Sequence, residues 1–291
     1  MKQKLLSALL GAAAGAVIAY PREAFEAALG GLTAFCSGVL PALLPLLFLM
    51  LLLSSRIPQK PAFFVPMALL CGSPGGARLL APLCGNKRAA AFYAAVSGTM
   101  SPMFLLSTLP MWLNAPGDGP ALLAAHLLGA LLCGFAVLAA QKIFLRRKDM
   151  RAGDPSGASF LSLGMSDSAP VTAGRAAAAA ANAMLTACVM VTAGFVLSAL
   201  VSRIFNRGAA MDAALSVLIE VTGGVRKLSL LSLKREALLP LVSFACGFGG
   251  LSIQLQNAAF LSERGVRLPL LFALGLLRGA LAALLCRLLI Y

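Results

Sequence analysis

Charged residues are scarce in this sequence, and their scarcity excludes a fold that is stable in water. Only 12% of the 291 residues are charged, whereas a soluble domain carries roughly 25%. Four windows hold no Asp, Glu, Lys or Arg at all: 27–55, 89–117, 176–202 and 238–262. Each is longer than the ~20 residues that cross a hydrocarbon core of ~30 Å. We therefore predict an all-α polytopic membrane protein, located in the cell (plasma) membrane.

Histidine occurs once, at His126, and none of the seven cysteines forms a CxxC pair. One histidine cannot make an HExxH motif, and neither GxSxG nor the P-loop pattern occurs. The single cysteines within apolar stretches behave as small hydrophobic side chains rather than as metal ligands. We therefore expect no enzymatic activity, no metal and no cofactor.

A basic face interleaved with aromatic side chains is also missing, although the formal net charge is +14. Nucleic acid is therefore excluded as a partner. The basic residues instead gather between the apolar windows, as loops beside anionic lipid headgroups do. Membrane lipid is the expected partner of these clusters: Lys2 with Lys4, Arg56 with Lys60, Lys87 with Arg88, and 146–148 with Arg151.

Glycine and proline interrupt several apolar segments. Residues 63–71 and 77–83 each make about half a span, and the intervening Gly-Ser-Pro-Gly-Gly of 72–76 is typical of a re-entrant hairpin. Residues 97–102 interrupt the next span. A second set of interruptions follows at 222–224, after a short helix over 211–221, and at 247–250 within the span 238–262.

The interruptions divide the chain into two similar halves. Residues 1–36 are predicted to form a first transmembrane helix and, from Pro21, an interfacial helix. The first membrane repeat covers 37–148, with a span over 39–54 kinked at Pro41 and Pro45. A flexible linker covers 149–174, and the second repeat covers 175–291. Matching interrupted segments in two halves predict inverted repeats around a midplane site. The orientation of the second half stays open, because its basic residues would lie outside.

The interruptions are also the best candidates for a binding site. A broken helix exposes unpaired N–H groups at one new end and unpaired C=O groups at the other. Arg78 would neutralise an anionic group, and Glu220 is expected to be either a coupling acid within the membrane or an interfacial acid. The candidate ligand-binding residues are Gly72, Ser73, Pro74, Gly75, Gly76, Arg78, Ser101, Glu220, Gly249, Gly250, Ser252, Gln254, Gln256 and Asn257.

Two structural alternatives stay open for these residues. The glycines would also permit close helix crossing without binding anything. Gln254 and Asn257 share a helical face, which suits either a polar ligand or hydrogen bonds between helices.

Several short motifs, taken in order, resemble the YlbJ-type sporulation integral membrane proteins of the nucleoside-recognition or Gate-domain group. They are Leu-Pro-Ala-Leu-Leu-Pro-Leu-Leu-Phe at 40–48, Gly-Ser-Pro-Gly-Gly-Ala-Arg at 72–78, Ser-Pro-Met-Phe at 101–104, His126 with Gly129, Glu-Val-Thr-Gly at 220–223, Gly-Phe-Gly-Gly-Leu-Ser at 247–252 with Gln256, and Arg278 with Gly279. Ser73 stands where the family pattern has an aromatic residue, and Arg78 where it has lysine. The resemblance covers about residues 20–290.

This resemblance implies a role in endospore formation, particularly cortex assembly, and a fold similar to nucleoside transporters. Two functions follow as hypotheses. The first is a transporter-like protein that handles a small polar or anionic solute at the interface of the repeats. The second is a non-transporting scaffold that recruits sporulation or cell-wall partners through residues around 146–174. Homo-oligomerisation is left open.

Overall fold

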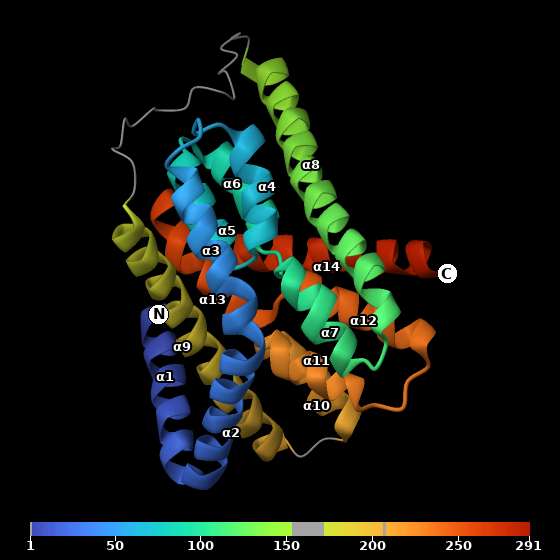
Figure 1. Cartoon of the computed structure of the whole chain (residues 1–291). Helices are drawn as coiled ribbons and strands as arrows, with labels where there is room; N and C mark the ends of the chain where they lie inside the picture. The colour runs from blue at the N-terminus through green and yellow to red at the C-terminus, as the bar shows by residue number, and fades with distance from the viewer. Residues whose placement is uncertain (1, 153–171, 206–207) are drawn as a thin grey trace.

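The computed structural model describes residues 2–152, 172–205 and 208–291, and these residues form helices without any strand (Figure 1). Five described segments are long and apolar enough to cross a membrane: Pro21–Ser54, Pro116–Ile143, Ala173–Phe205, Arg235–Arg264 and Leu268–Ile290. Large apolar side chains such as Phe25, Leu185 and Leu288 are exposed on the outside of these segments, where lipid takes the place of water. The predicted multi-pass helical membrane protein is confirmed.

The first part of the chain forms a helical hairpin. Helix α1 (Lys2–Ala19) turns at Tyr20 into α2 (Pro21–Ala34), which continues through the π-helical turn η1 (Phe35–Val39) into α3 (Leu40–Ser54). The segment from Pro21 that was predicted as an interfacial helix is thus continuous with α3 within one candidate span, Pro21–Ser54. Pro41 is the second residue after the π turn. Since proline lacks an N–H and clashes with the carbonyl four residues earlier, a wider turn before it relieves that clash.

The rest of the first half is a broken hairpin, a broken span and a long helix. The hairpin is α4 and α5 with a short turn η2, and the broken span is α6, η3 and α7. The bounds are α4 Pro61–Cys71, α5 Gly75–Leu80, η2 Ala81–Leu83, α6 Lys87–Ser97, η3 Phe104–Thr108, α7 Leu109–Trp112, η4 Pro116–Asp118 and α8 Gly119–Ala152. Residues 153–171 of the predicted linker lie outside the described residues.

The same order of elements recurs in the second half. A long helix α9 is followed by the hairpin α10–α11, the broken span α12–α13 and a last long helix. The bounds are α9 Ala173–Phe205, α10 Ala209–Ile219, α11 Val221–Ser229, α12 Arg235–Phe248, α13 Gly250–Leu261, η5 Ser262–Arg264 and α14 Leu268–Ile290.

The predicted break at 222–224 is wrong, because the interruption lies at Glu220. The Glu220 side chain caps α11, so the helix restarts at Val221 and includes Gly223 and Gly224. A Cβ on Gly224 would overlap the backbone of Val217, so glycine there lets the two arms of the hairpin touch. The predicted break at 72–76 in the first hairpin is also too long. Gly75 begins α5, so only residues 72–74 are non-helical.

The two halves interlock around a common centre. Helix α14 packs along α8 of the first half and along α12 of its own, and α3 packs on α9. Helix α13 reaches across the molecule to contact α5 of the first hairpin (Figure 1). These contacts bring the four helix interruptions into the buried interior.

Candidate functional site: a polar cavity between the broken helices

In the first half, the hairpin tip rests on the interruption of the next span. Gly72 has a φ of +66°, and a Cβ at this position would lie 2.6 Å from the Ser101 nitrogen. The Ser73 N–H donates to the Thr99 carbonyl at 2.6 Å. Only glycine combines this backbone conformation with such a close approach, so Gly72 fixes the tip against residues 98–101.

The second half has a corresponding contact, but here the closely packed glycine lies in the interrupted span and not in the hairpin tip. Gly250 begins α13 with a φ of +66°, and its Cβ would lie 2.7 Å from the Val217 carbonyl oxygen at the end of α10. At the tip, the Glu220 carboxylate accepts hydrogen bonds from Thr222 N at 3.0 Å and Gly223 N at 2.6 Å. Glu220 is only 1% exposed, and it has no ion pair within the described part of the chain. Two N–H groups of a helix start are what stabilise this buried side chain.

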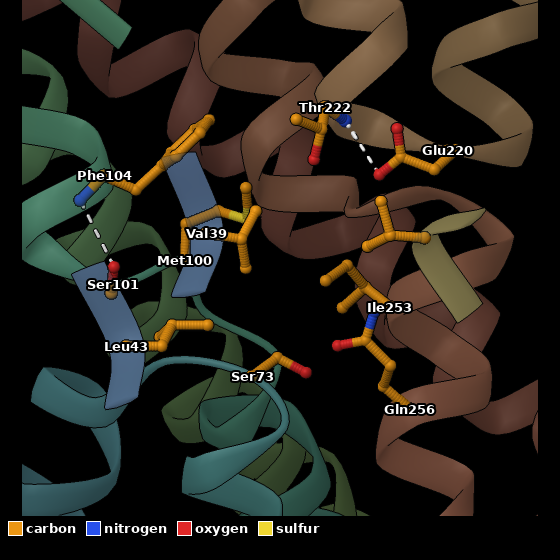
Figure 2. A pocket seen from close by; sticks show the side chains of 11 residues that line it. Val39, Leu43, Ser73, Met100, Ser101, Phe104, Glu220, Thr222, Ile253 and Gln256 are labelled. Atoms are coloured by element: carbon orange, nitrogen blue, oxygen red, sulfur yellow. Dashed lines mark hydrogen bonds between the residues drawn. The ribbon is translucent and has the colours of Figure 1, made fainter. Parts of the chain in front are cut away.

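A small cavity lies where the two sets of interruptions meet (Figure 2). Ser73 and Gln256 face it from opposite halves, and Glu220 and Thr222 border it from the second hairpin. Its volume is about 30 Å³, enough for water, which needs ~10–15 Å³, but far below the ~300 Å³ of a small ligand pocket. The full lining is Val39, Leu43, Ser73, Met100, Ser101, Phe104, Val191, Glu220, Thr222, Ile253 and Gln256.

Several buried polar atoms around this centre have no hydrogen-bond partner within the described residues. They include the Gln256 Nε2, the Asn257 Nδ2, the Ser252 Oγ and the Thr99 Oγ1 atoms. An unpaired buried polar group costs about 1–3 kcal/mol. The centre of the protein therefore holds hydrogen-bonding capacity that packing alone does not use.

The structure brings most of the predicted site residues to this centre. Ser73, Ser101, Glu220 and Gln256 line the cavity. Asn257 is joined to Ser73, whose hydroxyl donates to Asn257 Oδ1 at 2.7 Å. Gly72, Pro74, Gly249 and Gly250 form the interruptions themselves, and Ser252 is buried in the first turns of α13.

The remaining four predicted site residues do not line the central cavity. Arg78 and Gln254 make other contacts, and Gly75 and Gly76 allow close packing of the first hairpin. Arg78 is outside the cavity, with its guanidinium carbon 5.5 Å from the centre of the Phe260 ring, in a separate pocket at the surface. Gln254 is not among the residues that line the cavity, and its amide donates to the Phe248 carbonyl at 2.6 Å, where it caps α12. Gly75 and Gly76 are tightly packed, with a Gly76 Cβ only 2.7 Å from the Ala68 carbonyl oxygen.

Arg278 is the main structural residue absent from the predicted set. It is 1% exposed on α14, and it donates from Nε to the Gly247 carbonyl at 2.8 Å and from Nη1 to the Ala95 carbonyl at 3.0 Å. These carbonyls belong to the C-terminal ends of α12 and α6, which carry partial negative charge. One cation therefore bridges the broken spans of both halves. A charged residue in the middle of an apolar span is the signal that marks it in the sequence.

His126 of α8 has a related role in the first half. Its Nε2 atom accepts a hydrogen bond from Met100 N at 2.8 Å. Met100 lies in the interruption of the α6–α7 span, where backbone N–H groups lose their helical partners. His126 therefore stabilises the interruption from one side and Arg278 from the other. No group of three metal-ligating side chains occurs in the ranges that the structure describes.

Fold and site together define a class: polytopic helical membrane proteins in which two hairpins and two interrupted spans enclose a buried polar centre. The chain is similar to the sporulation integral membrane protein YlbJ of Bacillus subtilis (strain 168), with 27% identity over 321 residues that cover 92% of this chain and 78% of the relative. This similarity supports the YlbJ-type family for the chain. No family model and no solved structure matches it.

Proposed function

We propose that the chain is a transporter-like membrane protein that handles a small polar solute in the central cavity, between two halves related as inverted repeats. One observation carries the proposal: each half contributes a hairpin and an interrupted span to a single buried cavity. Interrupted helices that meet in the middle of a membrane protein are the usual construction of a solute site in secondary transporters.

The lining supports a neutral polar solute better than an anionic one. Hydroxyl groups come from Ser73, Ser101 and Thr222, and Gln256 adds an amide whose nitrogen has no hydrogen-bond partner in the described part of the chain. Among the residues that the structure describes, no Lys or Arg lines the cavity. An anion would also lie beside the Glu220 carboxylate, so its binding would require that this acid be protonated. Glu220 is then the group that would couple the solute to a proton.

The cavity must enlarge before it can hold such a solute. About 30 Å³ fits water but not a nucleoside or a dicarboxylate. The contact between Ser73 and Asn257 closes the cavity between the first hairpin and α13. We infer that separation of these two residues opens the site.

The small volume is also the observation that favours the alternative, a non-transporting membrane scaffold for sporulation or cell-wall partners. In either case the name of the relative suggests a role in sporulation, and cortex assembly is the specific step that we propose. The scaffold would depend on residues around 146–174 rather than on the cavity.

A binding screen separates the two functions. Purified protein would be screened by thermal shift against nucleosides, dicarboxylates and cell-wall precursors, in parallel with a Gln256→Ala variant. The transporter-like proposal expects a ligand that stabilises the native chain and fails to stabilise the variant. Stabilisation that is equal in both, or loss of spore heat resistance only on deletion of 153–171, would favour the scaffold.

A further inference from the structure

A second pocket lies on the outer side of Glu220. It has a volume of about 450 Å³ and is formed by α2, α9 and α11. Glu220 borders both this lateral pocket and the central cavity. Its remaining walls are Glu26, Ala27, Gly30, Phe195, Ser198, Ala199, Gly223, Arg226, Lys227 and Leu230. The volume falls within the ~300–1,000 Å³ typical of ligand sites.

The walls of the lateral pocket are mostly apolar and belong to helices that face lipid. Helices α2 and α9 are parts of two candidate membrane spans. At the edge of the pocket, the Leu230 side chain is 80% exposed, and Phe195 contributes an aromatic wall. A molecule in this pocket must therefore satisfy an apolar surface that opens sideways between spanning helices.

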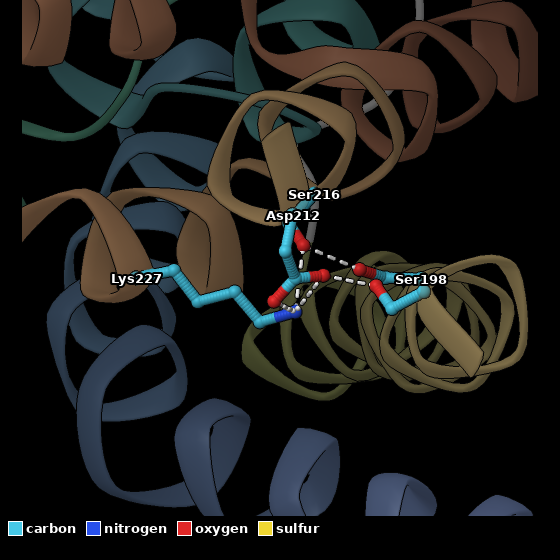
Figure 3. Close-up of polar contacts among 5 residues, drawn as sticks. Ser198, Asp212, Ser216 and Lys227 are labelled. Carbon is cyan, nitrogen blue, oxygen red and sulfur yellow. Dashed lines mark hydrogen bonds and ion pairs between the residues drawn. The ribbon is translucent and has the colours of Figure 1, made fainter. Parts of the chain in front are cut away.

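The polar end of the pocket is built around Lys227 (Figure 3). Its ammonium group forms an ion pair with Asp212 at 2.9 Å and donates to the Ser216 hydroxyl at 2.8 Å. Ser216 in turn lies 2.7 Å from the Ser198 hydroxyl, which lines the pocket. The cluster is therefore a connected hydrogen-bond network that joins the ion pair to the two serine hydroxyl groups.

The Glu220 carboxylate on the pocket wall is bonded to the Thr222 and Gly223 N–H groups, and the other acidic side chains nearby are paired with basic ones. Asp212 pairs with Lys227, and Glu26 pairs with Arg22 on the exposed side of α2. Arg226 is exposed and has no ion pair within the described residues. The lateral pocket thus presents the Arg226 guanidinium, which has no ion pair within the described residues, together with the paired Lys227 ammonium group and the Ser198 hydroxyl beside an apolar wall.

We propose that the lateral pocket binds an anionic phospholipid. Its phosphate contacts Arg226 and Lys227, and its acyl chains lie along the wall that includes Phe195 and Leu230. Basic residues next to an apolar groove between spanning helices are what recognise such headgroups. The inner wall of the site is Glu220, so the bound lipid lies directly behind the acid of the central cavity.

Lipid-dependent stability tests this proposal without reference to any solute. Delipidated full-length protein in detergent would be titrated with phosphatidylglycerol, with phosphatidylcholine and with diacylglycerol of the same chains, and the melting temperature recorded. Phosphatidylglycerol is expected to stabilise most. Arg226→Gln should weaken its apparent affinity about fivefold, whereas Arg267→Gln, an exposed arginine at the start of α14, should not.

A second variant and a second probe make the outcome decisive. Ala199→Phe fills the pocket without changing its charge and should also abolish the preference for phosphatidylglycerol. Glycerol 3-phosphate alone should give no comparable shift. The proposal is overturned by equal shifts with all three lipids, by equal losses in Arg226→Gln and Arg267→Gln, or by glycerol 3-phosphate acting as strongly as the lipid.

Discussion

Ser73, at the tip of the first hairpin, donates a 2.7 Å hydrogen bond to Asn257 in α13, and this bond joins the two halves of the chain beside the central cavity. Both side chains are almost fully buried. A buried hydrogen bond of this kind has an effect on stability that can be measured, because its loss leaves one polar group without a partner. It also marks the place where the halves must part if the cavity opens.

The Ser73–Asn257 bond should appear as a coupling energy. Ser73→Ala and Asn257→Ala should each lower the free energy of unfolding by about 1–2 kcal/mol. The double variant should lose less than the sum of the two. Chemical denaturation in detergent measures all three, with the exposed Ser107→Ala as the control. Additive losses would show that the two residues do not interact.

Arg278 should be among the residues most sensitive to substitution. Arg278→Met leaves the Gly247 and Ala95 carbonyls unpaired in the interior and should cost more than ~2 kcal/mol. Arg278→Lys should rescue only partly, since an ammonium group lacks the fork that reaches both carbonyls. Yield and melting temperature in detergent would be compared with Arg287→Met, an exposed arginine on the same helix. Equal effects at 278 and 287 would refute the bridging role.

Gly98 should tolerate no side chain. A Cβ there would overlap the guanidinium of Arg278, so Gly98→Ala must displace the bridge between the broken spans. We expect a clear fall in melting temperature. Gly15→Ala on α1 is the matched control, because its added Cβ would have no described residue within 4 Å apart from α1's own neighbouring backbone. That control should be neutral or slightly stabilising. Similar behaviour of the two variants would argue against the close approach.

Substitutions of Gln254 and Gln256 should have different effects, although the two residues lie close together in α13. The first should lower stability and the second should affect solute binding. Gln254→Ala removes the cap of the Phe248 carbonyl and should lower stability by about 1–2 kcal/mol. Gln256→Ala removes an amide whose nitrogen has no partner, so stability should change little while any solute-induced thermal shift is lost. The reverse pattern would contradict the assignment of these side chains.

Much of this architecture could be predicted from single residues. Three of the four charge-free windows, 27–55, 176–202 and 238–262, coincide with candidate membrane spans. The fourth window, 89–117, folds instead as the short helices of the first broken span. The Gly-Ser-Pro-Gly-Gly run at 72–76 predicted the first hairpin tip, because proline does not continue a helix. Residues 72–74 form that tip, whereas Gly75 and Gly76 belong to α5. Ser73, Ser101, Glu220 and Gln256 were predicted as site residues, and all four border the cavity.

The remaining differences from these predictions arise where one element depends on another. Gly223 and Gly224 predicted a break, but the Glu220 side chain caps the helix around them. An interfacial helix was predicted from Pro21, and the π turn before Pro41 makes α2 continuous with α3. The direction of Gln254 and the bridging contacts of Arg278 depend on carbonyls that only the folded chain brings near. Periodicity and composition contain none of these distances.

One measurement tests the central claim, that broken helices from both halves enclose a cavity that opens for a solute. Ser73→Cys and Asn257→Cys would be combined in a background lacking the seven native cysteines, oxidised in membrane vesicles, and assayed for binding of the solute found by the screen. We predict that a disulfide forms, that it abolishes binding, and that reduction restores it. Binding that is unchanged by the crosslink, or a pair that never crosslinks, would contradict the account.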